Sequence, residues 1–509
     1  MLTEAVIFLL IFFISILYII WQKQNFNYWK RHNIPYIKPI AFLGNLKEFL
    51  MFKQSFSQQM WTLYKTKGFE DEPMAGIYSL HTPTLLIRDI DLIKRILIKD
   101  FNSFSNRVIK ADEERDPLGK NNLFFVRNPG WRDLRPKISP VFTSGKVKQM
   151  YPLMLEIGDE LQQKLDTLPN EAIIDVKEIC VRFTTDLIGT IAFGINANSL
   201  KYDSEFYIHS REIFEVSPRR AFEIASLLLA PSLTILLRIK AFSKNTTKFL
   251  RSSIKHVIAE REKSGAIRND LIDTLIAMKQ EANSQPHIDN PAKDLDYLVA
   301  QAAIFQTAGS ETSSFSMAFA LYELALQPEL QDRLRTEIKE AFERGDGHIS
   351  YELIHELTYL AQVIDETLRK YPVLGFLERE CTAAESGYSL QPFNEFAVPA
   401  GMPVYISALG VHRDEKYWPD PDKFDPERFS PAQRDKINWD AYMPFGAGPH
   451  NCLGMRIALL QAKLGLICLL KKHRVVVSER TAIPIQFDPK SFLLSSKDGM
   501  FLKLEKVTD

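Results

Sequence analysis

Cysteine is scarce in this chain of 509 residues, which holds only Cys180, Cys381, Cys452 and Cys468. No two of them form a C-x-x-C pair, so the sequence predicts neither a zinc site nor an iron–sulfur cluster. A low, unpatterned cysteine count is typical of a protein from a reducing compartment.

Net charge is also absent, because Lys and Arg together number 63 and Asp and Glu together number 63. This balance gives no indication of a nucleic-acid partner. No G-x-G-x-x-G follows a predicted strand and no P-loop is present, so the chain carries no nucleotide-binding module of its own. Internal repeats and low-complexity tracts are absent too. The 46% hydrophobic content is ample for a large core.

The most informative stretch is FGAGPHNCLG, residues 445–454, which holds Cys452 in a glycine-rich loop. We expect Gly446, Gly448 and Gly454 to permit backbone conformations that a side chain would forbid, and to let a flat ligand come close. The apolar stretch that follows is predicted to form a helix. Cys452 then lies at a helix N-terminus, where the dipole favours a thiolate. Such a thiolate is suited to be an axial metal ligand or a nucleophile, and the alternative is a small buried hydrophobe.

A second motif lies in the stretch Leu298–Gln327, which is predicted to form a long apolar helix ended near Pro328. Its centre reads AGSETS. A glycine inside a helix costs about 1 kcal/mol relative to alanine, so something should offset it. Small Ala308 and Gly309 would let a flat ligand approach the backbone.

Two polar residues share this centre. The hydroxyl of Thr312 is able to bond back to the preceding turn and open the helix locally. Glu311 is a carboxylate inside an apolar stripe, which is costly unless it is used or paired. The alternative is a kinked core helix without chemistry.

Several weaker motifs accompany these two. Trp131 and Arg135 lie four apart on one predicted helical face, and a Trp N–H with an Arg fork suits a carboxylate. An Arg packed over a Trp at the surface is the alternative. Glu366 and Arg369 are spaced to pair on a helix, which by itself more often marks a surface ion pair. The PDPDKFDPERF segment follows, before the cysteine loop.

The N-terminal stretch Ala5–Trp21 is apolar and uncharged. As a helix it would span roughly 25 Å, slightly less than a bilayer core. We interpret residues 1–22 as an uncleaved transmembrane signal anchor, with a removed signal peptide as the alternative. Positive charges after the run place the rest of the chain in the cytoplasm. Residues 23–40 are predicted to form a basic, proline-stiffened hinge that is extended rather than helical and lies near lipid head groups.

Further expectations concern the surface. Residues 75–89 alternate and suit strands of a small sheet. The apolar stretch Ala225–Ile239 either dips into a membrane or forms a buried helix. Residues 269–293 are polar and are expected to form an exposed loop. Three lysines near the predicted Trp–Arg helix, Lys137, Lys146 and Lys148, form either a basic face for an acidic redox partner or ordinary solvated lysines.

Taken together, these motifs resemble the cytochrome P450 family, and within it the animal, insect-like microsomal members that oxidise foreign compounds. The resemblance runs in order from Pro35 to Gly454 and covers nearly the whole chain. It implies a mostly α fold with a small β-rich part, so that residues 41–509 form one heme-thiolate monooxygenase domain. It also implies heme b with a cysteine thiolate ligand.

The resemblance assigns roles to the residues that match the family's motifs. Cys452 is the implied axial ligand of the heme iron, with Thr312 and Glu311 as the catalytic pair that handles protons. The remaining implied heme contacts are Arg107, Trp131, Arg135, Arg379, His450, Phe445 and Ala308. At His450 the chain departs from the family, which usually has Arg there. Glu366, Arg369 and Arg428 match the family's structural triad.

The implied reaction inserts one oxygen atom from O2 into a lipophilic small molecule, in foreign-compound or hormone and lipid metabolism. Electrons would come from NADPH–cytochrome P450 reductase, with cytochrome b5 as a further partner and Arg456 and Lys463 as candidate docking contacts. The implied location is the endoplasmic reticulum membrane. Residues 107–120, 206–237 and 305 are candidates for substrate lining. The alternatives are a heme-thiolate isomerase or dehydratase, and a non-catalytic membrane heme protein.

Overall fold

The computed structural model describes residues 12–13, 16, 18, 21–22, 24–285 and 287–507. Most of the predicted signal anchor, residues 1–22, therefore lies outside the described residues. Among those described, no helix is long and apolar enough to cross a membrane. The chain divides into two compact units. The first comprises Met1–Val108, Gly375–Val411 and Ala447–His450, and the second Ile109–Leu374, His412–Gly446 and Asn451–Asp509.

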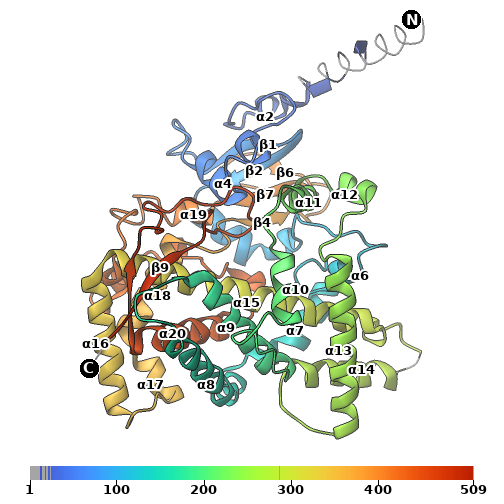
Figure 1. Ribbon diagram of the computed structural model, residues 1–509. Coiled ribbons are helices and arrows are strands. Elements are labelled where there is room, and N and C mark those ends of the chain that lie inside the picture. The colour runs from blue at the N-terminus through green and yellow to red at the C-terminus, as the bar shows by residue number, and fades with distance from the viewer. Residues whose placement is uncertain are drawn as a thin grey trace, which may run out of the picture. The chain divides into compact units, whose positions relative to one another are not determined.

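The first unit is built on a four-stranded sheet of order β1-β2-β7-β4, in which only the β2–β7 pair is parallel. Its strands β1 and β2 come from the stretch expected to form a small sheet, while β4 and β7 come from a much later part of the chain (Figure 1). The unit's elements are α2 (Tyr28–Arg31), α3 (Lys47–Leu50), α4 (Phe56–Tyr64), β1 (Met74–Ser79), β2 (Thr82–Ile87), α5 (Ile90–Lys94), η1 (Arg95–Lys99), η2 (Phe101–Phe104), β4 (Leu377–Glu380), β5 (Tyr388–Ser389), β6 (Ala397–Val398), β7 (Pro403–Ile406), α19 (Ala408–Val411) and η9 (Gly448–His450).

The predicted hinge is only partly extended. Tyr28–Arg31 forms one helical turn, α2, whereas we expected no helix before the prolines. The turn is stabilised by burial, because Trp29 is fully buried and its ring N–H donates to the Ile77 carbonyl at 2.9 Å. After it the chain is extended, and the Pro35 carbonyl accepts the Gly76 N–H at 2.8 Å. The extended part of the hinge is thus held against β1 rather than being a bare linker.

The second unit is mostly helical, and its three-stranded sheet has the order β3-β9-β8. The prediction from the sequence of a mostly α fold with a small β part is confirmed in this unit. Its elements are α6 (Pro117–Asn121), α7 (Gly130–Ile138), η3 (Ser139–Phe142), α8 (Ser144–Asp166), β3 (Ala172–Asp175), α9 (Val176–Ile188), η4 (Gly189–Phe193), α10 (Glu205–Ile213), α11 (Pro218–Leu229), α12 (Pro231–Leu237), α13 (Lys244–Ser264), α14 (Leu271–Ser284), η5 (Pro291–Lys293), α15 (Leu295–Leu326), α16 (Pro328–Arg344), α17 (Tyr351–Glu356), α18 (Thr358–Lys370), η6 (Pro426–Phe429), η7 (Arg434–Lys436), η8 (Trp439–Ala441), α20 (Met455–Lys471), β8 (His473–Val477) and β9 (Phe501–Lys506).

Helix α15 is the core of this unit and packs against α9, α20, α13, α6 and α18 (Figure 1). It starts three residues before the predicted start, because the Asp294 side chain accepts the Asp296 N–H at 2.9 Å and caps it. It ends at Leu326, as the following Pro328 predicted, since that proline opens α16.

Two surface expectations need correction. Residues 269–293 are not a loop along their length, because α14 occupies Leu271–Ser284. Its buried side chains Leu271, Leu275 and Met278 are spaced to form one apolar face, which outweighs the polar composition. The stretch Ala225–Ile239 divides at Ala230 between α11 and α12, so that Leu227 and Leu228 are buried while Ile235, Leu236 and Leu237 are exposed.

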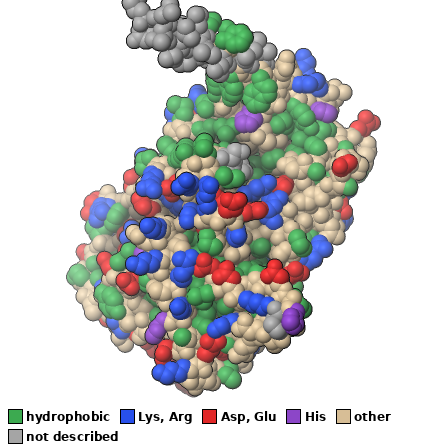
Figure 2. Space-filling model, turned by 90° about the vertical axis from the view of Figure 1, so that its right-hand side faces the viewer, with side chains coloured by type: hydrophobic (Ala, Val, Ile, Leu, Met, Phe, Trp, Pro, Cys, Tyr) green, Lys and Arg blue, Asp and Glu red, His purple; other side chains and the backbone are tan. Residues whose placement is uncertain are grey.

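The surface carries charges of both signs. On the face in Figure 2, Lys and Arg side chains lie among Asp and Glu, in keeping with the zero net charge.

Gly309 is required by the packing of α9 on α15, a reason that the sequence did not indicate. A Cβ there would lie 2.5 Å from Cδ1 of Ile188 on α9. We therefore expect Gly309→Ala to destabilise the protein by about 1–3 kcal/mol through overpacking, despite the gain in helix propensity of about 1 kcal/mol. Thermal melting of the purified full chain, followed by circular dichroism, measures the effect.

Gly145→Ala is the matched control, because Gly145 lies in α8 with no atom within 4 Å of the added Cβ. It should leave the midpoint unchanged or raise it. Adding Ile188→Val, which removes the Cδ1 atom, should restore part of the loss in Gly309→Ala. Equal midpoints for the two alanine variants would refute the close packing of α9 on α15.

Candidate functional site: the cysteine loop and the central helix

The loop that holds Cys452 is closed by a backbone hydrogen bond. The Cys452 N–H donates to the Phe445 carbonyl at 2.9 Å, and the Gly446 N–H donates to the Met443 carbonyl at 3.0 Å. Cys452 is exposed and lies two residues before Gly454, the N-cap of α20. The thiol is thus beside the N-terminus of a 17-residue helix, where the dipole stabilises a negative charge.

The three glycines of this loop differ in why a glycine suits each position. Gly446 and Gly448 both have φ near +70°, a conformation that side chains disfavour. A Cβ on Gly448 would also lie 1.8 Å from the Leu97 carbonyl oxygen. Gly454 has an ordinary φ of −82°, so the expectation of a special backbone is wrong there. Its added Cβ would only touch Phe142, at 3.6 Å.

Helix α7 supports the loop from one side. Nη2 of Arg135 donates to both the backbone carbonyl and Oδ1 of Asn451, each at 2.8 Å. Trp131 lies one turn earlier on the same helix and is buried. Trp131 and Arg135, which the sequence predicted to bind a carboxylate together, therefore share one helix, and Arg135 contacts the residue before Cys452.

Helix α15 presents a short accessible face in an otherwise buried element. Ala308 is exposed and Thr312, one turn on, is half-buried. The Thr312 hydroxyl donates to the Ala308 carbonyl at 2.6 Å, yet the helix stays regular, so the expected local opening does not occur. This face combines a small side chain with a hydroxyl.

Glu311 lies next to Thr312 but is 1% exposed. Its Oε2 is 3.3 Å from Nζ of Lys177 on α9. The Lys177 ammonium also lies 4.8 Å from the centre of the Phe315 ring. The cost of burying the carboxylate is therefore offset by an ion pair, which reaches toward the surface because Lys177 is 28% exposed.

The predicted contacts Arg107, Arg379 and His450 lie in the first unit. Arg107 pairs with Glu378 at 3.5 Å. Arg379 is buried on β4, and burial, helped by the nearby Arg107 charge, lowers its pKa to about 9. Its Nε has no hydrogen-bond partner among the described residues. A buried guanidinium of this kind is stabilised by a carboxylate.

His450 is buried and its Nε2 is 2.9 Å from the Ser105 carbonyl. A carbonyl oxygen only accepts, so Nε2 carries the proton and donates. The ring also packs edge-on against Phe101, at 5.1 Å between centres. The Nε2 proton is therefore used within the first unit, and the expected contact of His450 with heme stays a prediction.

Glu366, Arg369 and Arg428 come together in the second unit. Glu366 and Arg369 form a bidentate pair at 2.7 and 2.9 Å, and both are 0% exposed. Nε of Arg428 lies 3.4 Å from Glu366, and the Asp425 N–H donates to the same carboxylate at 2.8 Å. Arg369 also donates to the carbonyls of His412, Pro421 and Lys423.

The basic residues considered for docking differ in exposure. Lys137 and Lys148 form surface ion pairs with Glu281 and Glu352, which contribute little to stability. Lys463 is half-buried, donates to the Ile354 carbonyl at 3.1 Å, and has a pKa lowered by burial. A half-buried lysine that is already bonded is poorly placed as a docking contact. Arg456, by contrast, is exposed.

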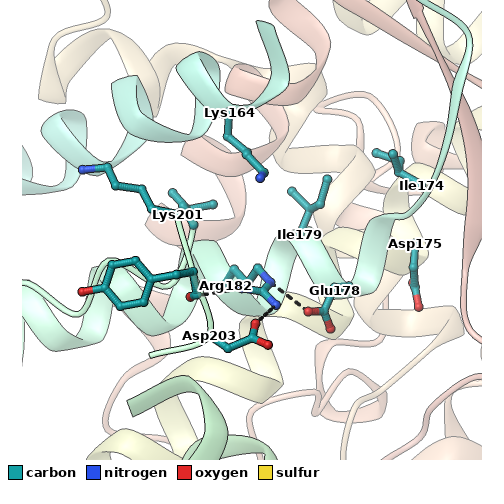
Figure 3. A pocket seen from close by; sticks show the side chains of 10 residues that line it. Lys164, Ile174, Asp175, Glu178, Ile179, Arg182, Lys201 and Asp203 are labelled. Atoms are coloured by element: carbon teal, nitrogen blue, oxygen red, sulfur yellow. Dashed lines mark hydrogen bonds and ion pairs between the residues drawn. The ribbon is translucent and has the colours of Figure 1, made fainter. Parts of the chain in front are cut away.

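A surface pocket of about 540 Å³ lies elsewhere in the second unit, beside α9 (Figure 3). Its central Arg182 donates to Glu178 and Asp203 and to the carbonyls of Ser199 and Tyr202. The guanidinium is thus occupied by groups of the chain itself, and the pocket contains none of the residues predicted from the sequence.

Comparison with known proteins agrees with this geometry. The family model described as Cytochrome P450 matches residues 34–502. The chain is 51% identical to probable cytochrome P450 6w1 of Drosophila melanogaster over 97% of each chain. It is 44% identical to probable cytochrome P450 6v1 of the same organism over 96% of each, and 38% identical to cytochrome P450 6k1 of Blattella germanica over 96% of this chain and 95% of that one.

A mostly helical fold with one exposed cysteine before a helix N-terminus, in a chain so related, defines a heme-thiolate enzyme. The chain belongs to the cytochrome P450 family, as the motifs predicted. It is therefore a cytochrome P450 monooxygenase, and its cofactor is heme with a cysteine thiolate ligand.

The residues present fit this cofactor. In the second unit, an exposed cysteine beside a helix N-terminus would supply the thiolate, and α15 offers small Ala308 on its accessible face. In the first unit, taken by itself, buried Arg379 suits a propionate carboxylate.

The sequence analysis did not identify Lys177 or Asn451. Lys177 lies on α9 and is distant in sequence from Glu311, so only helix packing reveals the pair. Asn451 precedes the cysteine, and its role as acceptor for Arg135 depends on where α7 lies.

Gly448→Ala should destabilise the protein much more than Gly401→Ala. Both glycines have positive φ, near +70° and +81°, so both substitutions incur a backbone cost of about 1–2 kcal/mol. Only at Gly448 does the Cβ also meet a carbonyl oxygen, since the added Cβ at Gly401 has no atom within 4 Å. Heme content per folded protein and the thermal midpoint measure the difference, and similar losses in the two variants would contradict it.

Proposed function

We propose that this chain is a microsomal monooxygenase that oxidises lipophilic small molecules, either foreign compounds or endogenous hormones and lipids. Residues 1–22 anchor it in the endoplasmic reticulum membrane. NADPH–cytochrome P450 reductase supplies its electrons, and cytochrome b5 is a further donor. The relatives, insect cytochromes P450 matched over nearly their whole length, support this proposal.

The observation that carries the proposal is the position of Cys452. It is exposed on a loop closed by the Phe445 carbonyl and supported by Arg135 through Asn451. In this proposal Cys452 is the axial ligand, Arg107, Trp131, Arg135, Arg379 and His450 hold or surround the heme carboxylates, and Phe445 packs beside the ligand. When bound, a thiolate-ligated heme supplies the chemistry that cleaves the O–O bond and transfers one oxygen atom.

The protein's own part in the reaction is to bind substrate and move protons. Thr312 presents its hydroxyl on the accessible face of α15, where the oxygen can accept a hydrogen bond while its proton is donated to the Ala308 carbonyl. Glu311 holds a carboxylate one residue away, and the Lys177 ammonium pairs with it from the surface side. This row of groups provides a route for protons from solvent to Thr312. Residues 107–120, 206–237 and 305 surround the substrate in this proposal.

The residues that we propose for contact with the electron donor and with the membrane are chosen by their exposure. Exposed Arg456, in the first turn of α20 after Cys452, is the favoured contact for an acidic electron donor, whereas Lys463 is withdrawn from the surface. The exposed apolar side chains of α12 are the candidates for contact with lipid in this proposal.

Replacing Cys452 with serine should abolish the red-shifted Soret band that a thiolate gives in the carbon monoxide complex of the reduced protein. Cys468→Ser is the control, because Cys468 lies on α20, the helix that follows Cys452, and burial raises the pKa of its thiol to about 12. That variant should keep the band. A retained band in Cys452→Ser would exclude Cys452 as the ligand.

Lys177→Met should lower the yield of product per NADPH consumed by roughly tenfold, because it leaves a buried carboxylate without its cation. The measurement uses an alkoxycoumarin with reductase and NADPH, and compares product formed with NADPH consumed.

Lys279→Met is the control, because Lys279 forms a comparable ion pair with Glu262, at 2.9 Å, away from α15. Thr312→Ala should also uncouple the reaction, diverting electrons to peroxide. Unchanged coupling in Lys177→Met would remove Lys177 and Glu311 from the proton route.

A further inference from the structure

The segment that leads into the cysteine loop is tied to helix α18 by one imidazole. His412 is 0% exposed. Its Nε2 lies 2.9 Å from the Met443 backbone nitrogen, and its Nδ1 lies 3.2 Å from the Arg369 carbonyl. An N–H only donates and a carbonyl only accepts, so Nε2 is the acceptor and Nδ1 carries the proton. The two contacts define a single neutral tautomer.

The surroundings keep this ring neutral. Burial, together with the charge of Arg369 and of Arg413, lowers the pKa of His412 to about 3. Protonation would place an N–H on Nε2 directly against the Met443 N–H. The contact with Arg369 is reciprocal, because the Arg369 guanidinium donates to the His412 carbonyl at 2.8 Å.

The neighbouring residue reinforces the same connection. The Tyr442 hydroxyl lies 3.1 Å from both the carbonyl and Oδ1 of Asp365 on α18. The rings of His412 and Tyr442 are stacked, with centres 5.7 Å apart and an angle of 24°. Residue 442 is therefore bonded to α18 directly, and residue 443 is connected to it through His412.

These bonds continue to the cysteine through the backbone. The Met443 carbonyl accepts the Gly446 N–H, and the Phe445 carbonyl accepts the Cys452 N–H. A displacement of Met443 would thus be transmitted to both ends of the turn that presents the thiol. Because hydrogen bonds to buried groups are costly to leave unmade, the imidazole holds Met443 in one position.

We infer that His412 is a positioning residue for the thiolate ligand: its neutral imidazole fixes Met443 against α18 and so sets the backbone of the loop that carries Cys452. This role rests on the proposed function of Cys452. It places the imidazole between the buried Glu366–Arg369 pair and the cysteine loop, where no motif assigned it.

The test compares His412→Phe, His412→Gln and the matched control His473→Phe in the full chain. Phenylalanine keeps the ring and its stacking but loses both hydrogen bonds. The amide oxygen of glutamine reaches about as far as Nε2 and is able to accept the Met443 N–H. His473 is 1% exposed on β8, and neither of its ring nitrogens has a hydrogen-bond partner among the described residues, so its substitution removes no such bond.

Two readouts are needed. Amide hydrogen exchange of the peptide that contains Met443 reports the bond without reference to heme, and should be roughly 5- to 10-fold faster in His412→Phe than in His473→Phe. The ratio of thiolate-type to non-thiolate Soret band in the carbon monoxide complex reports the ligand. It should fall several-fold in His412→Phe and recover in His412→Gln.

Each outcome decides a separate point. Equal exchange in the two phenylalanine variants, or faster exchange with an unchanged band ratio, overturns the inference. If His412→Phe does not fold, the His412→Gln variant is decisive. A His412→Gln protein that folds and shows the thiolate band supports the inference, and one that also fails to fold overturns it. Absence of the thiolate band in the wild type refutes the proposed ligand, while the exchange measurement still decides whether His412 holds Met443.

Discussion

The pair formed by Glu366 and Arg369 is the interaction on which much of the second unit depends. Both side chains are 0% exposed, and a buried charge that loses its partner costs about 3–5 kcal/mol. The pair is stable here because every polar atom finds a partner: Glu366 also accepts the Asp425 N–H, and Arg369 donates to three backbone carbonyls. These carbonyls belong to the segment 412–423, which has little regular structure of its own and is held in place by the guanidinium.

A series of hydrogen bonds therefore connects the buried ion pair with the residue that carries the thiol, Cys452. Helix α18 carries the pair. Tyr442 is hydrogen-bonded to this helix directly, and Met443 is connected to it through His412. Two backbone hydrogen bonds, from Gly446 to Met443 and from Cys452 to Phe445, extend the connection to the cysteine. Arg135 of α7 supports the loop from another element. A thiolate ligand must be held at a defined distance and angle, and a loop without such supports would not supply that geometry.

Helix α15 shows how one element serves packing and chemistry together. Its Gly309 allows close approach of α9, while Ala308 and Thr312 form the accessible face. The same close approach brings Lys177 of α9 to Glu311. The ion pair of the buried carboxylate next to Thr312 is thus a product of the packing that Gly309 permits, so that stability and the proposed proton route depend on the same helix pair.

Much of this could be predicted from the sequence. The apolar length of α15 and α20 and the strands β1 and β2 follow from local patterns, because burial periodicity and β-branched residues act over short distances. The family also follows, since its motifs are short and contiguous. The helix α14 was missed because its apolar face is narrow and its composition polar. The packing role of Gly309 was not foreseen, and the backbone of Gly454 was misinterpreted, because a glycine signals permitted space without saying what fills it.

By itself, the sequence determined which chemistry is available: one cysteine in a glycine-rich loop, a Glu–Thr pair in an apolar helix, and arginines suited to carboxylates. Only the tertiary structure decided how these groups are held. The partners Lys177, Asn451 and His412 come from distant parts of the chain, and a hydrogen bond or ion pair between distant residues depends on packing that no local pattern encodes. The same is true of His450, whose Nε2 proton is directed to the Ser105 carbonyl because its loop packs against that backbone.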